Sequence, residues 1–337
     1  MSDGPVRLAL VGTGIAARIL HAPALVALGD RFEVVAVANR TPEKAEAFRR
    51  ELFPGARVYR TLDEVLADPR VEAVDLLLPI AQTAAAAVAT IRAGKHLITE
   101  KPVAASTREG EEVLAAAAGA KAVAAVAENY RFQPRFRTVR AILGAGDIGA
   151  PRLITWSLLW SMTPENPYAK TDWRAAPAFP GGFVLDGGVH AAAVLNLVAG
   201  PARSAQAIAT RLHSVDGLDN TVSAGIEFAS GTIAHLLMTW GARDKEPDML
   251  RVFGDEGEIL AASDRIEVRT PAGTREHPID PGADGYREEF EDFYEAIRAQ
   301  RPPGVTIADA FDDMAVIEAI LASAASGHRE PVRTARR

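Results

Sequence analysis

A chain of 337 residues with 48% hydrophobic and 24% charged residues has the composition of a globular protein, and its length suits two domains of roughly 150 residues each. The formal net charge is −7 and the basic residues are scattered, so we expect no nucleic-acid partner. The chain has no cysteine and its seven histidines show no ligand spacing, so disulfides are excluded, no metal is expected, and the protein is expected to be cytoplasmic. The longest uncharged segment, residues 76–91, is too short to span a membrane.

The first predicted element is a strand, because Val6 to Val11 is a continuous apolar run of the kind found in buried parallel sheets. A GxGxxA pattern follows it directly, in Gly12-Thr13-Gly14-Ile15-Ala16-Ala17. The first glycine permits a tight turn, the second lets backbone amides approach a pyrophosphate, and the small Ala17 lets the next helix pack closely on the strand. The residues expected to hold a dinucleotide at the N-terminus of that helix are Gly12, Thr13, Gly14, Ile15 and Ala16.

The second predicted strand, Phe32 to Ala38, ends at the position that distinguishes NAD from NADP. An NAD site usually has Asp or Glu there for the ribose hydroxyls, whereas this chain has Asn39-Arg40-Thr41. A guanidinium and two neutral hydrogen-bonding groups would hold a 2′-phosphate that a carboxylate would repel. The pattern favours NADP and leaves NAD open, since Thr41 also suits the N-cap of a helix that Pro42 opens.

Strands and helices continue to alternate up to residue 127, which predicts a doubly wound parallel sheet. We assign residues 1–127 to a dinucleotide-binding Rossmann domain and place the boundary near Glu128. The later strands are predicted near Val58 and at Ala73–Leu78, His96–Thr99 and Val123–Ala127, and helices are predicted after Thr61, Pro79 and Ser106.

A lysine follows the predicted strand His96–Thr99, within Thr99-Glu100-Lys101-Pro102. Ligands of open α/β sheets bind outside the carboxyl ends of the strands, so Lys101 can reach a ligand, and its ammonium can polarise an alcohol or carbonyl oxygen. We expect Lys101 to be catalytic, and we expect Pro79, Glu100 and Lys101 to contact the dinucleotide. For this short motif taken alone, a solvated turn is the alternative.

From Pro151 onward, runs of period two predict antiparallel strands, so residues 128–337 are expected to form an α+β domain with a large, mostly antiparallel open sheet for substrate binding and oligomerisation. If helices cover only one face of this sheet, the other face is a candidate subunit interface. Helices with apolar residues at helical spacing are predicted at Tyr286–Gln300 and Ile307–Ala325. The strands are predicted at Arg152–Trp160, Ser204–His213, Thr221–Phe228, Thr232–Trp240, Leu250–Phe253 and Arg265–Arg269.

Two polar residues four positions apart, Asp186 and His190, lie in the glycine-rich segment 181–190. On a helix they share one face, where a carboxylate orients the imidazole of a proton acceptor, so we expect both to be catalytic. The alternative is a helix cap beside a core histidine, but the four glycines suggest close approach of a ligand to the backbone. The candidates for substrate contact are Tyr130, Arg131, Trp156, Tyr168, Trp173 and Arg174, and the loop 161–180 would set specificity.

With these motifs, the chain resembles the glucose-fructose oxidoreductase, inositol dehydrogenase and MocA (Gfo/Idh/MocA) family almost end to end. The motifs are the GxGxxA turn, residues 93–102 with Glu100-Lys101-Pro102, Glu128-Asn129-Tyr130-Arg131-Phe132, and Gly181-Gly182-x-x-x-Asp186-x-Gly188-x-His190. The resemblance implies a Rossmann domain, an α/β domain with an open sheet, and a homodimer or homotetramer formed through that sheet. It also implies that Lys101 contacts the reacting oxygen and the nicotinamide ribose, that His190 is the acid/base, and that Asp186 binds substrate and supports His190.

Two departures from the family pattern concern the cofactor. Many relatives have Pro-x-x-x-His after the fourth strand, whereas Pro79 is followed here by Thr83, so contacts at the inner end of the cofactor differ. The second departure is the missing acid at Asn39, which favours NADP.

These observations predict an NADP-dependent or NAD-dependent oxidoreductase that moves a hydride between nicotinamide and a hydroxyl-bearing carbon of a sugar, polyol or related ring compound. A dinucleotide sensor without catalysis is an alternative, but it would not need Lys101, Asp186 and His190 together. An NAD-dependent glycosidase of the same fold is a second alternative, and the expected lack of an export signal counts against it.

Overall fold

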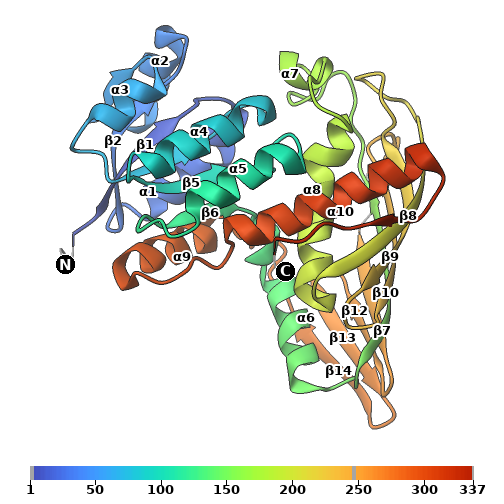
Figure 1. The fold of residues 1–337 in the computed structure, drawn as a ribbon. Coiled ribbons are helices and arrows are strands. Elements are labelled where there is room, and N and C mark those ends of the chain that lie inside the picture. The colour runs from blue at the N-terminus through green and yellow to red at the C-terminus, as the bar shows by residue number, and fades with distance from the viewer. Residues whose placement is uncertain (1–3, 245–247, 336–337) are drawn as a thin grey trace. The chain divides into compact units, whose positions relative to one another are not determined.

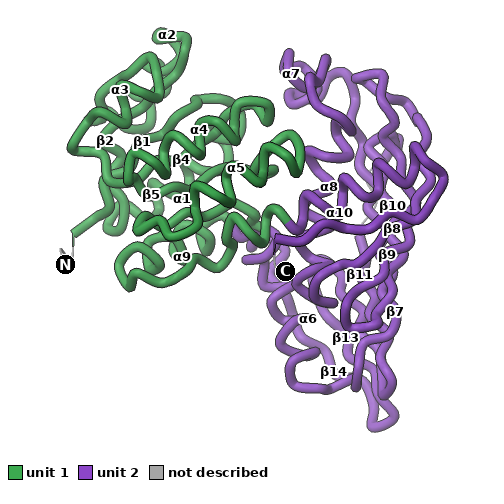
Figure 2. Tube along the Cα trace, viewed as in Figure 1, with its two compact units in different colours: residues 1–129, 286–311 green, residues 130–285, 312–337 purple. Residues whose placement is uncertain are grey.

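The chain forms two compact units in a computed structural model that describes residues 4–244 and 248–335. Unit 1 contains the chain up to residue 129 together with residues 286–311, and unit 2 contains residues 130–285 and those from 312 onward (Figure 2). The chain first passes from unit 1 to unit 2 after residue 129, two residues after the domain boundary predicted at residue 127. Residues 286–311, which the sequence analysis placed in the second domain, belong to the compact body of unit 1.

Unit 1 is built on a six-stranded parallel sheet in the order β3-β2-β1-β4-β5-β6, which confirms the predicted doubly wound Rossmann sheet. The strand order reverses between β1 and β4, and such a switch point is where dinucleotides bind in this type of fold. The strands are β1 (Val6–Val11), β2 (Phe32–Ala38), β3 (Arg57–Tyr59), β4 (Ala73–Leu76), β5 (His96–Glu100) and β6 (Ala124–Ala127).

Helix α9 explains why a late segment of the chain belongs to unit 1. Phe290 and Phe293 of α9 are fully buried in one hydrophobic core with Phe32 and strand β1, and Phe32 packs edge-on against Phe290 at 5.8 Å. Burial of two aromatic side chains is a large favourable contribution, so the Rossmann sheet needs this helix as a cover. The helical elements of unit 1 are η1 (Ala17–His21), α1 (Ala22–Ala27), α2 (Pro42–Leu52), α3 (Leu62–Ala67), α4 (Ile80–Arg92), α5 (Thr107–Ala117) and α9 (Tyr286–Ala299).

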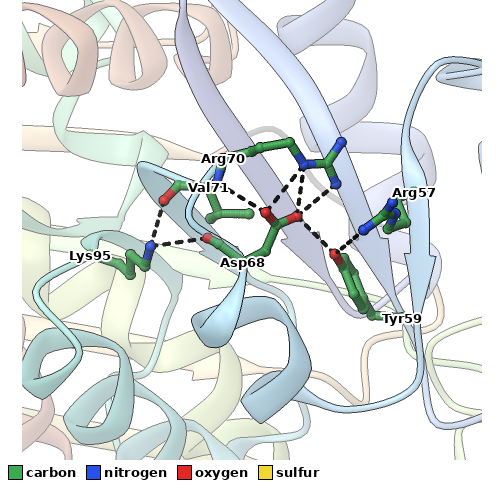
Figure 3. A network of polar contacts seen from close by, with 6 residues as sticks. All are labelled: Arg57, Tyr59, Asp68, Arg70, Val71 and Lys95. Atoms are coloured by element: carbon green, nitrogen blue, oxygen red, sulfur yellow. Dashed lines mark hydrogen bonds and ion pairs between the residues drawn. The ribbon is translucent and has the colours of Figure 1, made fainter.

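A polar network between β3, α3 and β4 fixes one side of unit 1 (Figure 3). The side chain of Asp68 accepts hydrogen bonds from the Arg70 guanidinium and from the Tyr59 hydroxyl, the latter at 2.8 Å. Lys95 Nζ donates to the main-chain oxygens of Asp68 and Val71. The Arg70 guanidinium lowers the pKa of the Asp68 carboxyl well below its usual range, so this connection stays ionised and ordered at neutral pH.

Unit 2 is built on a nine-stranded sheet in the order β14-β13-β12-β11-β7-β10-β9-β8-β15. Only β7 and β10 pair in parallel, so the predicted mostly antiparallel sheet is confirmed. The predicted strands are present within a few residues at each end, while β12, β14 and β15 were not predicted. The strands are β7 (Pro151–Leu159), β8 (Ala202–Thr210), β9 (Thr221–Phe228), β10 (Ile233–Thr239), β11 (Met249–Gly254), β12 (Glu258–Ala261), β13 (Arg265–Thr270), β14 (Gly273–Pro278) and β15 (Glu330–Pro331).

Helices lie along one face of this sheet (Figure 1). They are α6 (Pro134–Ala145), α8 (Gly182–Ala199) and α10 (Ile307–Ser326), of which α10 begins in unit 1, and two shorter elements are η2 (Asn129–Arg131) and α7 (Asp172–Ala175). On the opposite face, Ile208 and Ile233 are 77% and 53% exposed. Among the described helices, α8 alone is long and apolar enough to cross a membrane, but 78% of that stretch is buried inside the protein, as in the core helix of a globular fold.

Candidate active site

The glycine turn has the conformation and the open space that a dinucleotide needs. Gly12 has φ +104°, and a Cβ there would lie 2.1 Å from the Leu77 main-chain oxygen, so no other residue fits. A Cβ added to Gly14 would meet no described atom within 4 Å, which leaves the turn open to a pyrophosphate. Ala17 is fully buried where η1 begins. The glycine pattern therefore fits a dinucleotide for the reasons expected from the sequence.

At the end of β2, the Asn39 side chain is used within the protein. Its Nδ2 donates to Thr13 Oγ1 at 2.7 Å, and its Oδ1 accepts the Thr41 N–H at 2.9 Å. Thr41 occupies the N-cap of α2 with Pro42 at the first turn, but its side chain forms no capping hydrogen bond. Arg40 is exposed and, among the described residues, forms no hydrogen bond or ion pair. Asn39 therefore ties the glycine turn to β2 and leaves Arg40 available to a ligand.

A second arginine near Arg40 was missed in the sequence analysis. Strand β3 pairs Tyr59 with Ala38, and the Asn39 N–H donates to the Tyr59 carbonyl at 3.3 Å. Arg60 follows Tyr59 directly and is exposed, so two cations lie at adjacent strand ends. The signal in the sequence is the pairing of the short strand β3 with β2, which brings the residue after each strand to the same edge.

Lys101 lies at the carboxyl end of β5, as the sequence predicts. It is half-buried, and its backbone N–H donates to Glu100 Oε2 at 3.1 Å. Pro79 is the N-cap residue of α4 at the end of the neighbouring strand. Thr83, which stands where many relatives have histidine, is buried, and its hydroxyl donates to the Pro79 carbonyl at 3.4 Å. Thr83 thus completes a helix turn and offers no ring to a cofactor.

In unit 2, the first turns of α8 carry both Asp186 and His190, one helical turn apart. Asp186 is buried and accepts a hydrogen bond from Arg174 Nε at 2.6 Å. The half-buried imidazole of His190 stacks almost flat on the Tyr130 ring, with centroids 4.3 Å apart and an angle of 16°. The predicted carboxylate and imidazole therefore share one face of α8, and each is held by a side chain from another part of unit 2.

Stacked aromatic rings connect His190 to the core of unit 2. Phe136 stacks on Tyr130 at 5.7 Å, and Trp156 packs edge-on against Phe136 at 5.5 Å. Trp156 is only 1% exposed, because alternation along β7 turns it toward the helices. We therefore assign Trp156, a candidate for substrate contact, to the core.

Arg131, another candidate for substrate contact, forms a buried ion pair. Its Nη2 donates to both carboxylate oxygens of Asp313 on α10, at 2.8 and 3.0 Å. Asn196 on α8 donates to the same carboxylate at 2.8 Å. Because the ion pair ties η2 to α10, we assign Arg131 a structural role.

The remaining candidates gather around Asp186. The Arg174 guanidinium lies 3.8 Å from the ring centre of Trp173 and 4.9 Å from that of Tyr168, and these cation–π contacts hold the arginine in place. All three side chains are half-buried. This group, with its guanidinium next to Asp186, brings three of the residues predicted for the substrate together.

Packing within unit 2 accounts for the glycines of α8. A Cβ at Gly181 would lie 2.5 Å from Leu321, one at Gly182 would lie 2.4 Å from Asp216, and one at Gly187 would lie 2.6 Å from Trp240. Gly188 is tight against Ile317. The Trp240 ring requires a small residue at Gly187, and the positive φ of Gly181 (+85°) and Gly182 (+46°) favours glycine there, so the expected close approach of a ligand is not needed to explain them. Within residues 4–244 and 248–335, no three His, Asp or Glu side chains gather as a metal site.

The fold and these residues define an NAD-binding Rossmann-fold oxidoreductase: residues 6–128 match the model of the oxidoreductase family with that fold. Residues 136–260 match the GFO/IDH/MocA C-terminal domain, and the chain belongs to the Gfo/Idh/MocA family. It is 30% identical over 339 residues to an uncharacterized Saccharomyces cerevisiae protein (95% of this chain, 96% of that one) and 28% identical over 340 residues to the 1,5-anhydro-D-fructose reductase of Ensifer adhaerens (97% and 99%). An oxidoreductase structure from Thermotoga maritima is similar with a TM-score of 0.90, 32% identity and coverage of 97% and 98%.

Proposed function

We propose that the protein is an NADP-preferring oxidoreductase that moves a hydride between nicotinamide and a CH–OH or C=O carbon of a sugar, polyol or related ring compound. The observation that carries this proposal is the pair on α8, where Asp186 is held by Arg174 and His190 is held flat against Tyr130. A half-buried imidazole with a fixed ring plane suits a proton acceptor. The similarity to a reductase of an anhydro sugar supports the substrate class.

Each residue has a separate task in the proposed mechanism. The nicotinamide, when bound, supplies or accepts the hydride. In unit 2, His190 accepts the hydroxyl proton during oxidation and returns it during reduction. The role proposed for Lys101 of unit 1 is to stabilise, through its ammonium, negative charge that develops on oxygen during the reaction. Asp186 and Arg174 orient the substrate hydroxyls, with Trp173 and Tyr168 as neighbouring contacts. The amides of residues 12–16 hold the pyrophosphate at the start of η1.

The preference for NADP follows from two exposed arginines at the ends of β2 and β3. The 2′-phosphate carries negative charge, and Arg40 and Arg60 are both exposed cations, while no carboxylate occupies position 39. NAD binding remains open because the Asn39 amide does not repel a ribose hydroxyl.

We expect a titration that follows nicotinamide fluorescence to show tighter binding of NADPH than of NADH. Arg40→Ser and Arg60→Ser should each weaken NADPH binding by roughly tenfold, the equivalent of about 1.4 kcal/mol, and leave NADH binding unchanged. Equal loss for both dinucleotides would contradict a 2′-phosphate site. If the protein, shown by absorbance to be free of dinucleotide, binds neither, the oxidoreductase proposal is wrong.

We further propose a homodimer or homotetramer that forms through the face of the unit 2 sheet opposite its helices. That face carries the exposed Ile208 of β8 and Ile233 of β10, and no described helix of unit 2 covers it (Figure 1). Burial of such residues favours association. A monomer mass by light scattering at micromolar concentration would rule this interface out. The proposed compartment is the cytoplasm, in keeping with a chain that has no cysteine.

A further inference from the structure

His21 is a fully buried histidine in unit 1 to which the proposed chemistry gives no task. It is the last residue of η1, the π-helical turn that follows the glycine pattern. Its Nδ1 lies 2.9 Å from Asp75 Oδ2 on β4, and its Nε2 lies 3.3 Å from Glu100 Oε1 at the end of β5. The second contact is an ion pair whose geometry falls short of a hydrogen bond. The His21 ring therefore connects η1 with strands β4 and β5.

The surroundings of the ring favour the protonated form of His21. A carboxylate only accepts hydrogen bonds, so Nδ1 carries a proton when it donates to Asp75, and a second proton on Nε2 would face the Glu100 carboxylate. Burial by itself lowers the pKa of His21, but the charges of Asp75 and Glu100 and the hydrogen bond to Asp75 oppose it and hold the pKa well above its usual value.

Helix α9 covers this ring and contributes a buried carboxyl group, that of Glu289. Phe290 packs edge-on against the imidazole at 5.2 Å, and Tyr286 lies 6.1 Å away at a tilt. Glu289 on the same helix is buried, and burial raises its pKa well above the usual range; the charge of His21 opposes this effect, and the charges of Glu100 and Glu128 add to it. The carboxyl groups in contact with His21 are those of Asp75 and Glu100, and burial also raises the pKa of Asp75.

Glu100 contacts both His21 and the backbone of Lys101. One oxygen of the Glu100 carboxylate, Oε1, is in contact with His21, and the other, Oε2, accepts the backbone N–H of Lys101 at 3.1 Å. A continuous set of contacts thus runs from β4 through the end of η1 to the backbone of the proposed catalytic lysine. The other histidine of this sheet, His96 on β5, is half-buried, and its Nδ1 accepts the Val123 N–H at 2.9 Å.

We propose that His21 is a positioning residue: by bridging Asp75 and Glu100 it fixes the carboxylate that holds the Lys101 backbone, and it couples that backbone to the helix expected to bind the dinucleotide. This proposal rests on the catalytic role proposed for Lys101. A buried ion pair is a weak source of stability, because desolvation offsets the attraction between its charges. We therefore expect the ion pair to act mainly by fixing the position of Lys101, because displacing a catalytic group by about 1 Å can lower the rate of catalysis roughly 100-fold.

Four variants separate positioning from stability. His21→Gln keeps a donor but removes the charge, and Asp75→Asn removes the anion that faces Nδ1. The double variant His21→Leu with Asp75→Leu replaces both buried charges by apolar side chains, which is expected to preserve folding. His96→Gln is the matched control, because His96 is a histidine in the same sheet whose contacts do not reach Glu100.

The measurements are the thermal midpoint, the hydrogen-exchange rate of the Lys101 amide, and kcat and KM with NADPH and the best carbonyl substrate of a keto-sugar screen. For His21→Gln and the double variant we expect faster exchange at Lys101 and a kcat lower by about 10- to 100-fold, with KM for NADPH within about threefold, because positioning rather than binding is lost. His96→Gln should change neither kcat nor the Lys101 amide.

The pH dependence of kcat is a further test, because a purely structural role of His21 would leave it unchanged. Because the pKa of His21 is raised by its partners, its bridging contribution is complete below about pH 6.5 and is lost as the pH rises through the raised pKa. Asp75→Asn removes part of that shift, so the loss of kcat at high pH should move to lower pH. An unchanged profile would count against the proposal.

A folded double variant with wild-type kcat and wild-type exchange at Lys101 would overturn the proposal. If the wild-type protein binds dinucleotide but reduces no carbonyl substrate, the proposed function has failed, and the exchange rate of the Lys101 amide in the variants still decides whether His21 positions that backbone.

Discussion

The two units each hold a histidine beside a carboxylate, and the two histidines differ in what surrounds them. His21 in unit 1 is completely buried between Asp75 and Glu100 and is covered by α9. His190 in unit 2 is half-buried and stacks on Tyr130, on a helix face shared with Asp186. Proton exchange with a substrate requires access, so the same side chain is suited to fixed structure in unit 1 and to acid–base chemistry in unit 2.

The largest expected effect tests whether His190 is the histidine that exchanges a proton. His190→Asn should lower turnover by about 10²- to 10⁴-fold, the contribution of a general acid or base. Its thermal midpoint and its affinity for NADPH should stay close to wild type, because the ring is half-buried and belongs to unit 2. Steady-state kinetics and calorimetry on the same preparation check both statements. Full turnover in His190→Asn would assign the proton transfer elsewhere.

A smaller effect tests how the ring of His190 is held. Tyr130→Leu removes the flat stack at 4.3 Å and should lower kcat by roughly fivefold, in keeping with an aromatic contact of about 1 kcal/mol, while Tyr130→Phe should stay near wild type. Phe136→Leu is the control, because Phe136 stacks on Tyr130 at 5.7 Å, whereas the ring stacked on His190 is that of Tyr130. It should lower the thermal midpoint and spare kcat. Equal losses of kcat in Tyr130→Leu and Phe136→Leu would point to a general packing effect.

The smallest expected effect is a change in the pH dependence of stability, and it concerns the buried carboxyl group of Glu289. Because burial raises the pKa of Glu289, the folded protein keeps a proton that the unfolded chain releases above about pH 4.3, so stability falls as the pH rises from there toward the raised pKa. Glu289→Gln removes this dependence. Its thermal midpoint should match wild type near pH 4 and exceed it at pH 8 by about 2–4 °C, the shift that ~1 kcal/mol gives. A difference that does not change with pH would mean that Glu289 is ionised in the folded protein.

Much of the fold follows from local sequence patterns. The six parallel strands and the main antiparallel strands were predicted because apolar runs and period-two alternation identify strands within short windows. The position of α9 could not be predicted in this way, because its aromatic face packs against strands more than 200 residues earlier in the chain, and periodicity does not specify the partner of an apolar face. The same limit applies to Trp156, whose alternation was recognised but whose burial depends on α6.

The residues of the candidate site were likewise predicted only in part. Lys101, Asp186 and His190 were selected from motifs, and the structure places Asp186 and His190 on one face of α8, while their catalytic roles remain predictions. The bridge at His21 was missed, although Asp75 gave a signal as a lone carboxylate inside the apolar strand Ala73–Leu76. A buried charge in such a strand indicates a buried partner, but the partner is 54 residues away and only the folded chain identifies it.

The return of α9 to unit 1 has a consequence for the order in which the protein is made. A ribosome that has released residues 4–129 has delivered all six strands of the Rossmann sheet but not Phe290 or Phe293. The nascent sheet must then keep part of its apolar surface uncovered while more than 150 further residues are synthesised. The N-terminal part of the chain thus completes its core only after residues 286–311 have been synthesised, and its uncovered apolar surface needs protection by chaperones in the interval.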